Sequence, residues 1–319
     1  MKAAIGVLAL LMLVVPSTTV AQNYPEKPIR LIVGYPPGGG NDIIARLFGP
    51  KLSEGLGQPV IIENRPGAAT NIAQEIVAKS EPDGYTLLLG SPGVAINRSL
   101  YKKLSFDALR DLVGVSLFAV SPNLLLVNPS VPAKNIKELI ALARSKPGKL
   151  TFSSSGSGSS QHLAGVLFNI RAKVDTLHVP YKGTAPSLVG LISGEVDMTY
   201  TNIPASLAHI RSGRLRALAS TWTKRSELLP DVPTMKESGI DMDVTVWYSV
   251  LAPAKTPRAI INKIAGVLVK IPHTPEMKKR LADLGAEPVG NSPEEFDKFL
   301  HAETEQWAEV VKASGAKAD

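Results

Sequence analysis

The sequence predicts a mixed α/β protein with two lobes, each built around a doubly wound, largely parallel sheet with helices on both faces. Two observations predict this class. Short apolar runs with strand character alternate with helical patterns over most of the chain, which is typical of β–α–β units. Two longer strand-like stretches, 116–128 and 244–254, bracket the middle of the chain. We expect them to be the two strands that cross between the lobes.

The first part of the chain follows the order strand, helix, strand, helix, strand. Strands are predicted at 29–35, 59–64 and 85–91, and helices at 41–56 and 69–80. Asn41 or Asp42 is a suitable N-terminal cap for the first helix. Gly49 and Pro50 lie inside that helix, and we expect them to weaken or kink it, because proline removes a helical hydrogen bond.

The middle of the chain contains a second unit of the same kind, and helices dominate after it. In the second unit, strands are predicted at 150–155, 176–181, 196–201 and 215–221, and helices at 135–146, 159–171 and 185–194. Later helices are predicted at 257–270, 275–284, 293–301 and 303–313. Because the chain is expected to cross twice, we assign 22–121 and 248–319 to lobe 1 and 122–247 to lobe 2.

The composition excludes several classes of site. The chain of 319 residues contains no cysteine, so it has no disulfide, thiolate nucleophile or iron–sulfur cluster. Its five histidines lack metal-ligand spacing, so neither a metal nor another cofactor is expected: His162, His178, His209, His273 and His301. The formal net charge is +7, but the basic residues are scattered and no aromatic–basic motif accompanies them. We therefore expect no nucleic-acid partner.

The N-terminus has the features of a secretory signal peptide. Lys2 precedes the apolar run 3–15, and Thr19–Ala21 suits a signal peptidase. We expect cleavage after about Ala21 and an extracytoplasmic location. The alternative is an N-terminal membrane anchor, but the apolar run is short for a membrane span.

Two glycine-rich loops follow predicted strands. The first, YPPGGGND at 35–42, lacks the lysine of a P-loop and the third glycine of the dinucleotide-binding fingerprint. The second, SSSGSGSSQHL at 153–163, has Gln161 where that third glycine would stand. Both patterns argue against a nucleotide.

Four loops at strand ends contain neither Lys nor Arg: 34–42, 91–93, 153–160 and 200–202. Helix N-termini and glycine-rich backbone can bind a small anion without a basic side chain, and a carboxylate fits such a site. Polar side chains that could orient it are Ser91, Ser155, Ser159, Thr201, Asn41 and Asn202. The alternative is that these residues only cap helices and form turns. We favour binding because several loops share this character.

Two other interpretations were weighed on particular residues. Ser159 and His162 are one helical turn apart, which leaves a secreted serine hydrolase as the alternative class, although no orienting acid or oxyanion site accompanies them. Phe48, Trp247 and Trp307 could form an aromatic ligand cage, but their spacing fits core packing better.

Nearly the whole mature chain resembles the solute receptors of tripartite tricarboxylate transporters, of the Bug (Bordetella uptake gene) type. The similar segments include YPEKPIRLIVGYPPGGGND, PDGYTLLLGS, SGSGSSQHLAGVLF, HVPYKGTAPSLVGLISGEVDM and SPEEFDKFLHAETEQWAEVVK. The resemblance implies a two-lobed periplasmic binding protein, type II-like, that closes on a small organic carboxylate and is not an enzyme. It also implies delivery to one large and one small integral membrane subunit. We expect a monomer, and the same receptor could instead serve a signalling partner.

The resemblance also implies which loops bind ligand. Together with the loop analysis it gives the following candidate residues: Tyr35, Pro36, Gly38, Gly39, Asn41, Asp42, Ser91, Ser155, Gly156, Gly158, Ser159, Tyr200, Thr201 and Asn202. The chain departs from the family at Asn41, where Thr or Ser is common, and at Ala69–Thr70, where a glycine pair is common. Ligand identity therefore stays open among di- and tricarboxylates, amino acids and aromatic acids. Asp42 could meet an ammonium group, but we favour helix capping.

Overall fold

The computed structural model describes residues 23–314 and 316. The predicted signal peptide and its cleavage site lie outside these residues. Three short strands near the start of the described chain, the first strand group, run parallel in the order β2-β1-β3. They are β1 (Ile29–Val33), β2 (Val60–Asn64) and β3 (Thr86–Gly90).

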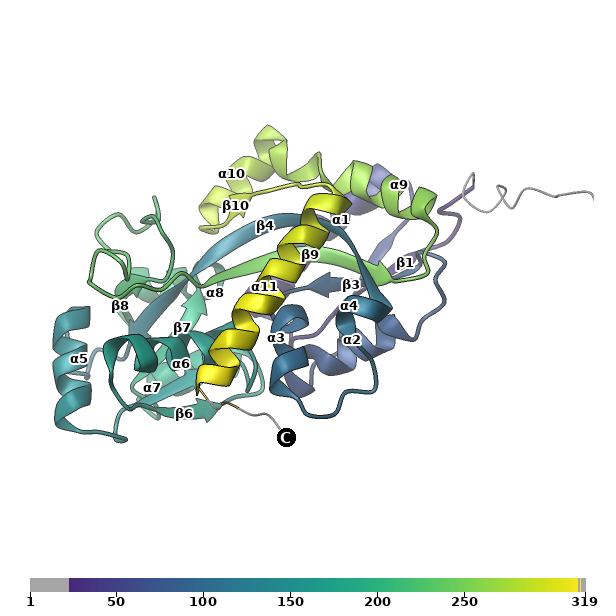
Figure 1. Cartoon of the computed structure of the whole chain (residues 1–319). Coiled ribbons are helices and arrows are strands. Elements are labelled where there is room, and N and C mark those ends of the chain that lie inside the picture. Colours follow the sequence, from purple (N-terminus) through teal and green to yellow (C-terminus); the bar gives the residue numbers. More distant parts are fainter. Residues whose placement is uncertain (1–22, 315, 317–319) are drawn as a thin grey trace, which may run out of the picture.

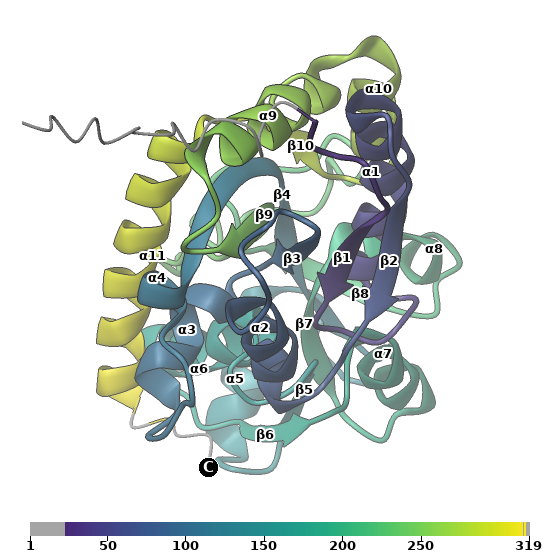
Figure 2. The same ribbon diagram turned by 90° about the vertical axis from the view of Figure 1, so that its right-hand side faces the viewer.

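Helices connect and cover the first strand group. They are α1 (Gly40–Leu56), the 3-10 turn η1 (Ala68–Thr70), α2 (Asn71–Ala78), α3 (Gly93–Leu100) and α4 (Ala108–Asp111). The first helix packs on β2 and the second on β3 (Figure 2). Pro50 lies inside α1, which nevertheless continues to Leu56. The helix α3 was not predicted, because its first residue follows Pro92 and no side chain caps it.

Two long strands join the two halves of the sheet. The strand β4 (Leu112–Val127) pairs antiparallel with β9 (Thr245–Pro253) through most of its first two thirds. From Asn123 onward β4 pairs instead with β7 (Met198–Asn202) and β8 (Arg216–Ser220). With β5 (Thr151–Ser154) and β6 (Leu177–Pro180), the main path of the sheet is β2-β1-β3-β9-β4-β7-β5-β6. Off this path, β8 and β10 (Glu287–Pro288) also pair with β4. Figure 1 shows β4 and β9 running beside each other through the middle of the molecule. The predicted lobe boundaries at these strands stay a prediction.

The second strand group repeats the parallel arrangement. It contains β5 (Thr151–Ser154), β6 (Leu177–Pro180), β7 (Met198–Asn202) and β8 (Arg216–Ser220), with α5 (Ile136–Ser145), α6 (Ser160–Ala172), α7 (Thr184–Ser193) and α8 (Ile203–Arg211). The strands β5, β6 and β7 are parallel to one another. Asn135 caps α5 by accepting from the Glu138 amide, which is the start signal that its sequence offers.

The C-terminal part returns to the first strand group. It contains α9 (Arg258–Leu268), η2 (Ile271–His273), α10 (Pro275–Asp283), β10 (Glu287–Pro288) and α11 (Pro293–Ser314). The prediction of separate helices at 293–301 and 303–313 was wrong, because no glycine or proline interrupts this stretch. The single helix packs on α3, β4 and α6 (Figure 1) and so contacts elements from both parts of the sheet.

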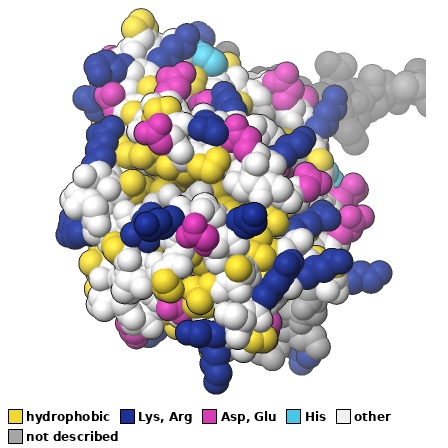
Figure 3. Space-filling model, turned by 90° about the vertical axis from the view of Figure 1, so that its left-hand side faces the viewer, with side chains coloured by type: hydrophobic (Ala, Val, Ile, Leu, Met, Phe, Trp, Pro, Cys, Tyr) yellow, Lys and Arg dark blue, Asp and Glu magenta, His cyan; other side chains and the backbone are white. Residues whose placement is uncertain are grey.

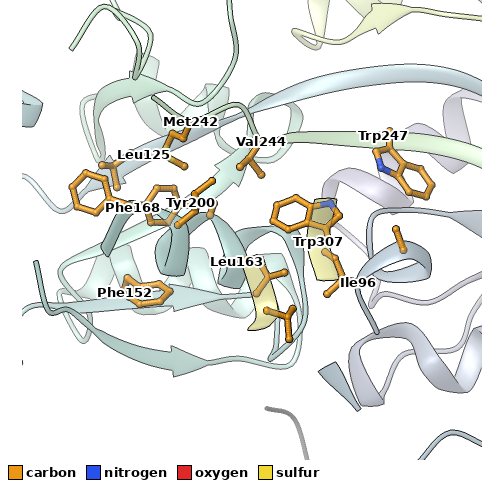
Figure 4. Packing of buried hydrophobic residues seen from close by; sticks show 14 of the residues in the cluster. Ile96, Leu125, Phe152, Leu163, Phe168, Tyr200, Met242, Val244, Trp247 and Trp307 are labelled. Atoms are coloured by element: carbon orange, nitrogen blue, oxygen red, sulfur yellow. The ribbon is translucent and has the colours of Figure 1, made fainter. Parts of the chain in front are cut away.

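The three aromatic residues considered for a ligand cage are core residues. Phe48, Trp247 and Trp307 are almost fully buried. Figure 4 shows Trp247 and Trp307 among apolar side chains from several elements. Both indole N–H groups donate to one oxygen of Glu303, at 2.8 Å from Trp247 and 3.1 Å from Trp307. Burial raises the pKa of Glu303.

The surface carries mixed charge. On the face in Figure 3, Lys and Arg side chains are spread out and Asp and Glu side chains lie between them. Among residues 23–314 and 316, no helix is both long and apolar enough to cross a bilayer.

Candidate ligand-binding site

A cavity of about 490 Å³ lies where loops of both strand groups meet. Its lining residues come from three places near the first strand group and two near the second: Gly34–Pro36, Pro66–Thr70, Tyr101, Ser155–Ser157 and Tyr181–Gly183. The volume falls within the range of small-molecule sites. The cavity is therefore the candidate ligand site.

The loop between β1 and α1 is held by Asp42. This carboxylate is 4% exposed. It accepts from the Gly38 amide at 3.0 Å, from Arg46 Nε at 2.9 Å and from Asn64 Nδ2 at 3.0 Å. Burial alone would raise the pKa of Asp42, but the bonds from Arg46, Gly38 and Asn64 together hold it below its ordinary value. No side chain caps α1 at Gly39, so Asp42 organises the loop from the first turn of the helix.

The loop between β5 and α6 is held by neutral groups. Ser154 Oγ accepts from the Gly156 amide at 3.1 Å and lies 2.6 Å from His178 Nε2. The Gly158 amide donates to His162 Nδ1 at 3.2 Å. The rings of His162 and His178 stack with their centroids 4.0 Å apart. Two histidines thus support the backbone of a loop that lines the cavity.

Both of these histidines are neutral at ordinary pH. Burial lowers the pKa of His162 to about 4. Burial, together with the neighbouring His162, lowers the pKa of His178 to about 3. A neutral His162 keeps the Nδ1 lone pair that the Gly158 amide needs.

A third wall is formed by the segment after β2. Ala68, Ala69 and Thr70 all have positive φ, at 45°, 50° and 78°, a conformation that costs non-glycine residues free energy. Asn97 Nδ2 donates to the Ala69 carbonyl at 2.7 Å, and Gln74 Nε2 donates to Thr70 Oγ1 at 2.8 Å. These bonds hold the strained segment against the cavity.

Four of the predicted site residues line the cavity: Tyr35, Pro36, Ser155 and Gly156. The others are not among its lining residues: Gly38, Gly39, Asn41, Asp42, Ser91, Gly158, Ser159, Tyr200, Thr201 and Asn202. Ser91 Oγ lies 3.4 Å from the hydroxyl of Tyr35, which is a lining residue. Tyr200 is fully buried in the core. A ligand role for these residues stays a prediction.

The start of α1 nevertheless meets the second strand group closely. A Cβ atom added at Gly40 would lie 2.4 Å from the Asn202 side chain, and one added at Gly183 would lie 2.8 Å from Pro36 Cγ. Only glycine permits these approaches. Asn202 itself caps α8 by accepting from the Ala205 amide at 3.2 Å. Gly40 and Gly183 therefore permit close contact between the two halves.

Sequence reasoning missed the wall at Gly67–Thr70, and it missed Tyr101, Tyr181 and Lys182. A sequence signal for this wall existed: Pro66 and Gly67 lie two and three residues after the end of β2, and parallel strands end at one edge of a sheet. No local pattern pointed to Tyr101, which lies after α3.

The hydrolase arrangement is absent at Ser159 and His162. Ser159 Oγ accepts from the main-chain amide of His162 at 3.2 Å and donates to the Gly156 carbonyl at 2.8 Å. The imidazole of His162 faces the Gly158 amide instead. Ser159 is thus a helix cap. Within the described part of the chain, no three His, Asp or Glu residues are grouped so that they could hold a metal ion.

Solved structures share this fold over nearly their whole length. A structure titled "R. palustris Rpa4515 with adipate" superposes with a TM-score of 0.89 at 36% identity, covering 92% of this chain and 99% of that chain. MatC from Rhodopseudomonas palustris with bound malate has a TM-score of 0.85 at 32% identity, covering 90% and 100%. The periplasmic binding protein BugD has a TM-score of 0.88 at 32% identity, covering 93% and 100%.

Sequence comparison agrees with the structural one. The model of the tripartite tricarboxylate transporter family receptor matches residues 44–316. Protein BugT of Bordetella pertussis is 39% identical over 300 residues, which is 93% of this chain and 92% of that protein. The chain therefore belongs to the tripartite tricarboxylate transporter (TctC/Bug) receptor family, whose members are solute-binding receptors and not enzymes.

Proposed function

We propose that this protein is a periplasmic receptor that binds a small organic carboxylate in the cavity between the two strand groups. The observation that carries the proposal is the lining itself. Glycine-rich loops and hydroxyl groups from both halves face one cavity, and no Asp or Glu is among the described lining residues. Such a lining suits an anion, because main-chain N–H groups and hydroxyls can solvate a carboxylate.

Binding is expected to close the molecule around its ligand. In this proposal, one lobe of the protein consists of residues 22–121 and 248–319, and the other consists of residues 122–247. The approach of Gly183 to Pro36 and of Gly40 to Asn202 supports a closed arrangement of the two. Hinge closure is the usual motion of receptors that bury a ligand between lobes.

The bound carboxylate is then delivered to a membrane carrier. The family description, a receptor of a tripartite transporter, supports a transporter partner. The proposed partner has one large and one small integral membrane subunit. The receptor acts as a monomer that is exported by its signal peptide and cleaved after about Ala21. A second candidate role is signalling, in which the same closed form binds a signalling protein. Solute uptake measured in cells that lack the receptor distinguishes the roles, because uptake is lost only if the receptor serves transport.

The first test is a thermal-shift panel of small carboxylates, followed by calorimetric titration. A ligand at one hundred times its dissociation constant adds about 2.7 kcal/mol, which is a rise in Tm of roughly 4–10 °C for a chain of this size. Ser157 lines the cavity, so Ser157→Trp should fill it and abolish the shift. Thr223 is exposed and outside the lining, so Thr223→Trp should retain it. If no carboxylate raises Tm in protein stripped of ligand by unfolding and refolding, the proposal fails.

A further inference from the structure

We infer that the ligand is an organic acid with two acidic groups and no amino group, and that Lys182 receives the second acidic group. This inference rests on the proposed function, since it concerns the chemistry of the same cavity. It narrows the carboxylates left open by the sequence and assigns a specificity-determining role to one residue.

Lys182 is the one charged side chain among the described residues that line the cavity. It is exposed, and none of the ion pairs found among residues 23–314 and 316 involves it. Other basic residues near the loops are engaged: Arg46 pairs with Asp42, and Arg65 pairs with Glu63. Lys182 is therefore free to meet an anionic group of the ligand. A charge-assisted bond of this kind is stronger than a neutral one.

Lys182 is also fixed next to the anion-binding loops. Its neighbour Gly183 packs on Pro36, and a Cβ atom added at Gly156 would lie 3.5 Å from the Tyr181 carbonyl. Residues 181–183 therefore contact the first loop and the second loop together. One acidic group can bind the main chain of these loops while the other meets the Lys182 ammonium.

An amino group of a ligand has no carboxylate to meet in this cavity. Asp42 is the candidate in the sequence, but both its oxygens are occupied. Oδ1 accepts from Asn64 Nδ2, Oδ2 accepts from the Gly38 amide, and Arg46 Nε lies within 3.0 Å of each. Asp42 is also not a lining residue. An ammonium group would lose water without gaining an opposite charge, and it would be repelled by Lys182.

The cavity lining also offers apolar surface to a spacer between the two acids. Pro36, Pro66 and Ala68 contribute aliphatic carbon to the lining, and Tyr35 and Tyr101 contribute aromatic side chains. An aliphatic chain or an aromatic ring buries apolar area against such walls. The ligand class is therefore an α,ω-dicarboxylate with an aliphatic or aromatic body.

The test compares ligands that differ by one group. Dissociation constants are measured by calorimetry for succinate, glutarate, adipate and terephthalate, for the monoacids butyrate, valerate, hexanoate and benzoate, and for aspartate, glutamate and 2-aminoadipate. The best diacid should bind at least tenfold more tightly than its monoacid and than its amino analogue. A monoacid or an amino acid that binds as tightly as its matched diacid overturns the inference and leaves the carboxylate receptor intact.

Variants of Lys182 test the assigned role. Lys182→Ala should weaken diacid binding about tenfold and leave monoacid binding unchanged, whereas Lys182→Arg should restore most of the diacid affinity. Lys102 is exposed beside Tyr101 but does not line the cavity, so Lys102→Ala is the matched control. Two results would overturn the role of Lys182. One is that Lys182→Ala weakens the binding of monoacids and diacids equally, and the other is that Lys182→Ala and Lys102→Ala weaken diacid binding equally. If no acid in any series binds the unaltered protein, the proposed function itself fails.

Discussion

The two glycine-rich loops of the site look alike in sequence, yet the structure stabilises them by different chemistry. The β1–α1 loop is held by Asp42, which is ionised and paired with Arg46. The β5–α6 loop is held by Ser154 and by the neutral rings of His178 and His162. The helix α1 after the first loop has no side-chain cap, whereas Ser159 caps the helix α6 after the second loop. The β1–α1 loop therefore depends on an ionised carboxylate, and the β5–α6 loop depends on two histidines that remain neutral.

This difference makes pH a way to separate the loops. Asp42 has a pKa below its reference value of 3.8, so it stays ionised until the solution is strongly acidic. His162 and His178 have folded-state pKa values of about 4 and about 3, below the value of 6.5 in an unfolded chain. Because only the unfolded state takes up protons as pH falls below 6.5, each histidine destabilises the folded state progressively.

The largest expected effect is therefore a loss of stability in mild acid. Between pH 7 and pH 4.5 each of the two histidines should remove roughly 2–3 kcal/mol from the free energy of unfolding. Ligand affinity should be retained over this range and fall only near pH 4, where the folded protein protonates His162 and the Gly158 amide loses its acceptor. Chemical unfolding and calorimetric binding at a series of pH values measure both quantities.

A double variant provides the control for the pH prediction. His162→Asn retains an acceptor near the Nδ1 position, and His178→Gln retains a polar group near Ser154. The variant should have a much flatter stability profile between pH 6.5 and 4.5. His209 also has a lowered pKa through burial and the nearby Arg214, so a residual slope will remain. An unchanged slope would show that the histidine pair does not titrate as inferred.

The next effect tests the charged loop. Asp42→Ala removes the acceptor of three donors and leaves these part-buried hydrogen bonds unmade, at a cost of about 2–4 kcal/mol. The Tm should fall by roughly 5–10 °C, and this loss should be similar at pH 7 and pH 5. Arg46→Ala is the control, because the Arg46 side chain is about half exposed and an exposed pair contributes less than about 1 kcal/mol. If Arg46→Ala costs as much as Asp42→Ala, the ion pair and not the loop bonds stabilises this region.

The order of strands and helices could be predicted because hydrophobic periodicity and helix-capping residues are local signals in the sequence. Capping was the alternative considered for Ser159 and Asn202, and in the structure each of them caps a helix. The helix α3 was not predicted, because it begins just after Ser91–Pro92 and has no capping side chain. The pairing of β4 with β9 and then with β7 could not be read locally, because register along a long strand depends on which partners reach it.

The candidate site likewise contains residues that local sequence signals predict and residues that they do not. Tyr35, Pro36, Ser155 and Gly156 were predicted from their place just after strands, and they line the cavity. Thr70 and Lys182 were not predicted, because their positions depend on the strained turn at Ala68–Thr70 and on the packing of Gly183 against Pro36. Such approaches between distant segments leave no periodic pattern in the sequence.

The smallest expected effect comes from giving the first loop the cap that the second already has. Gly39 precedes α1 with φ −83° and ψ 168° and has no capping side chain. A Cβ atom there would meet Thr184 Cβ at 3.5 Å, which is an ordinary contact, so Gly39→Ser should fit. A serine at this position should stabilise α1 by a few tenths of a kcal/mol, seen as a small rise in the urea midpoint at unchanged m. Gly39→Ala is the matched control that adds the Cβ without the hydroxyl. If both variants change the midpoint equally, the hydroxyl contributes nothing and Asp42 already satisfies the helix start.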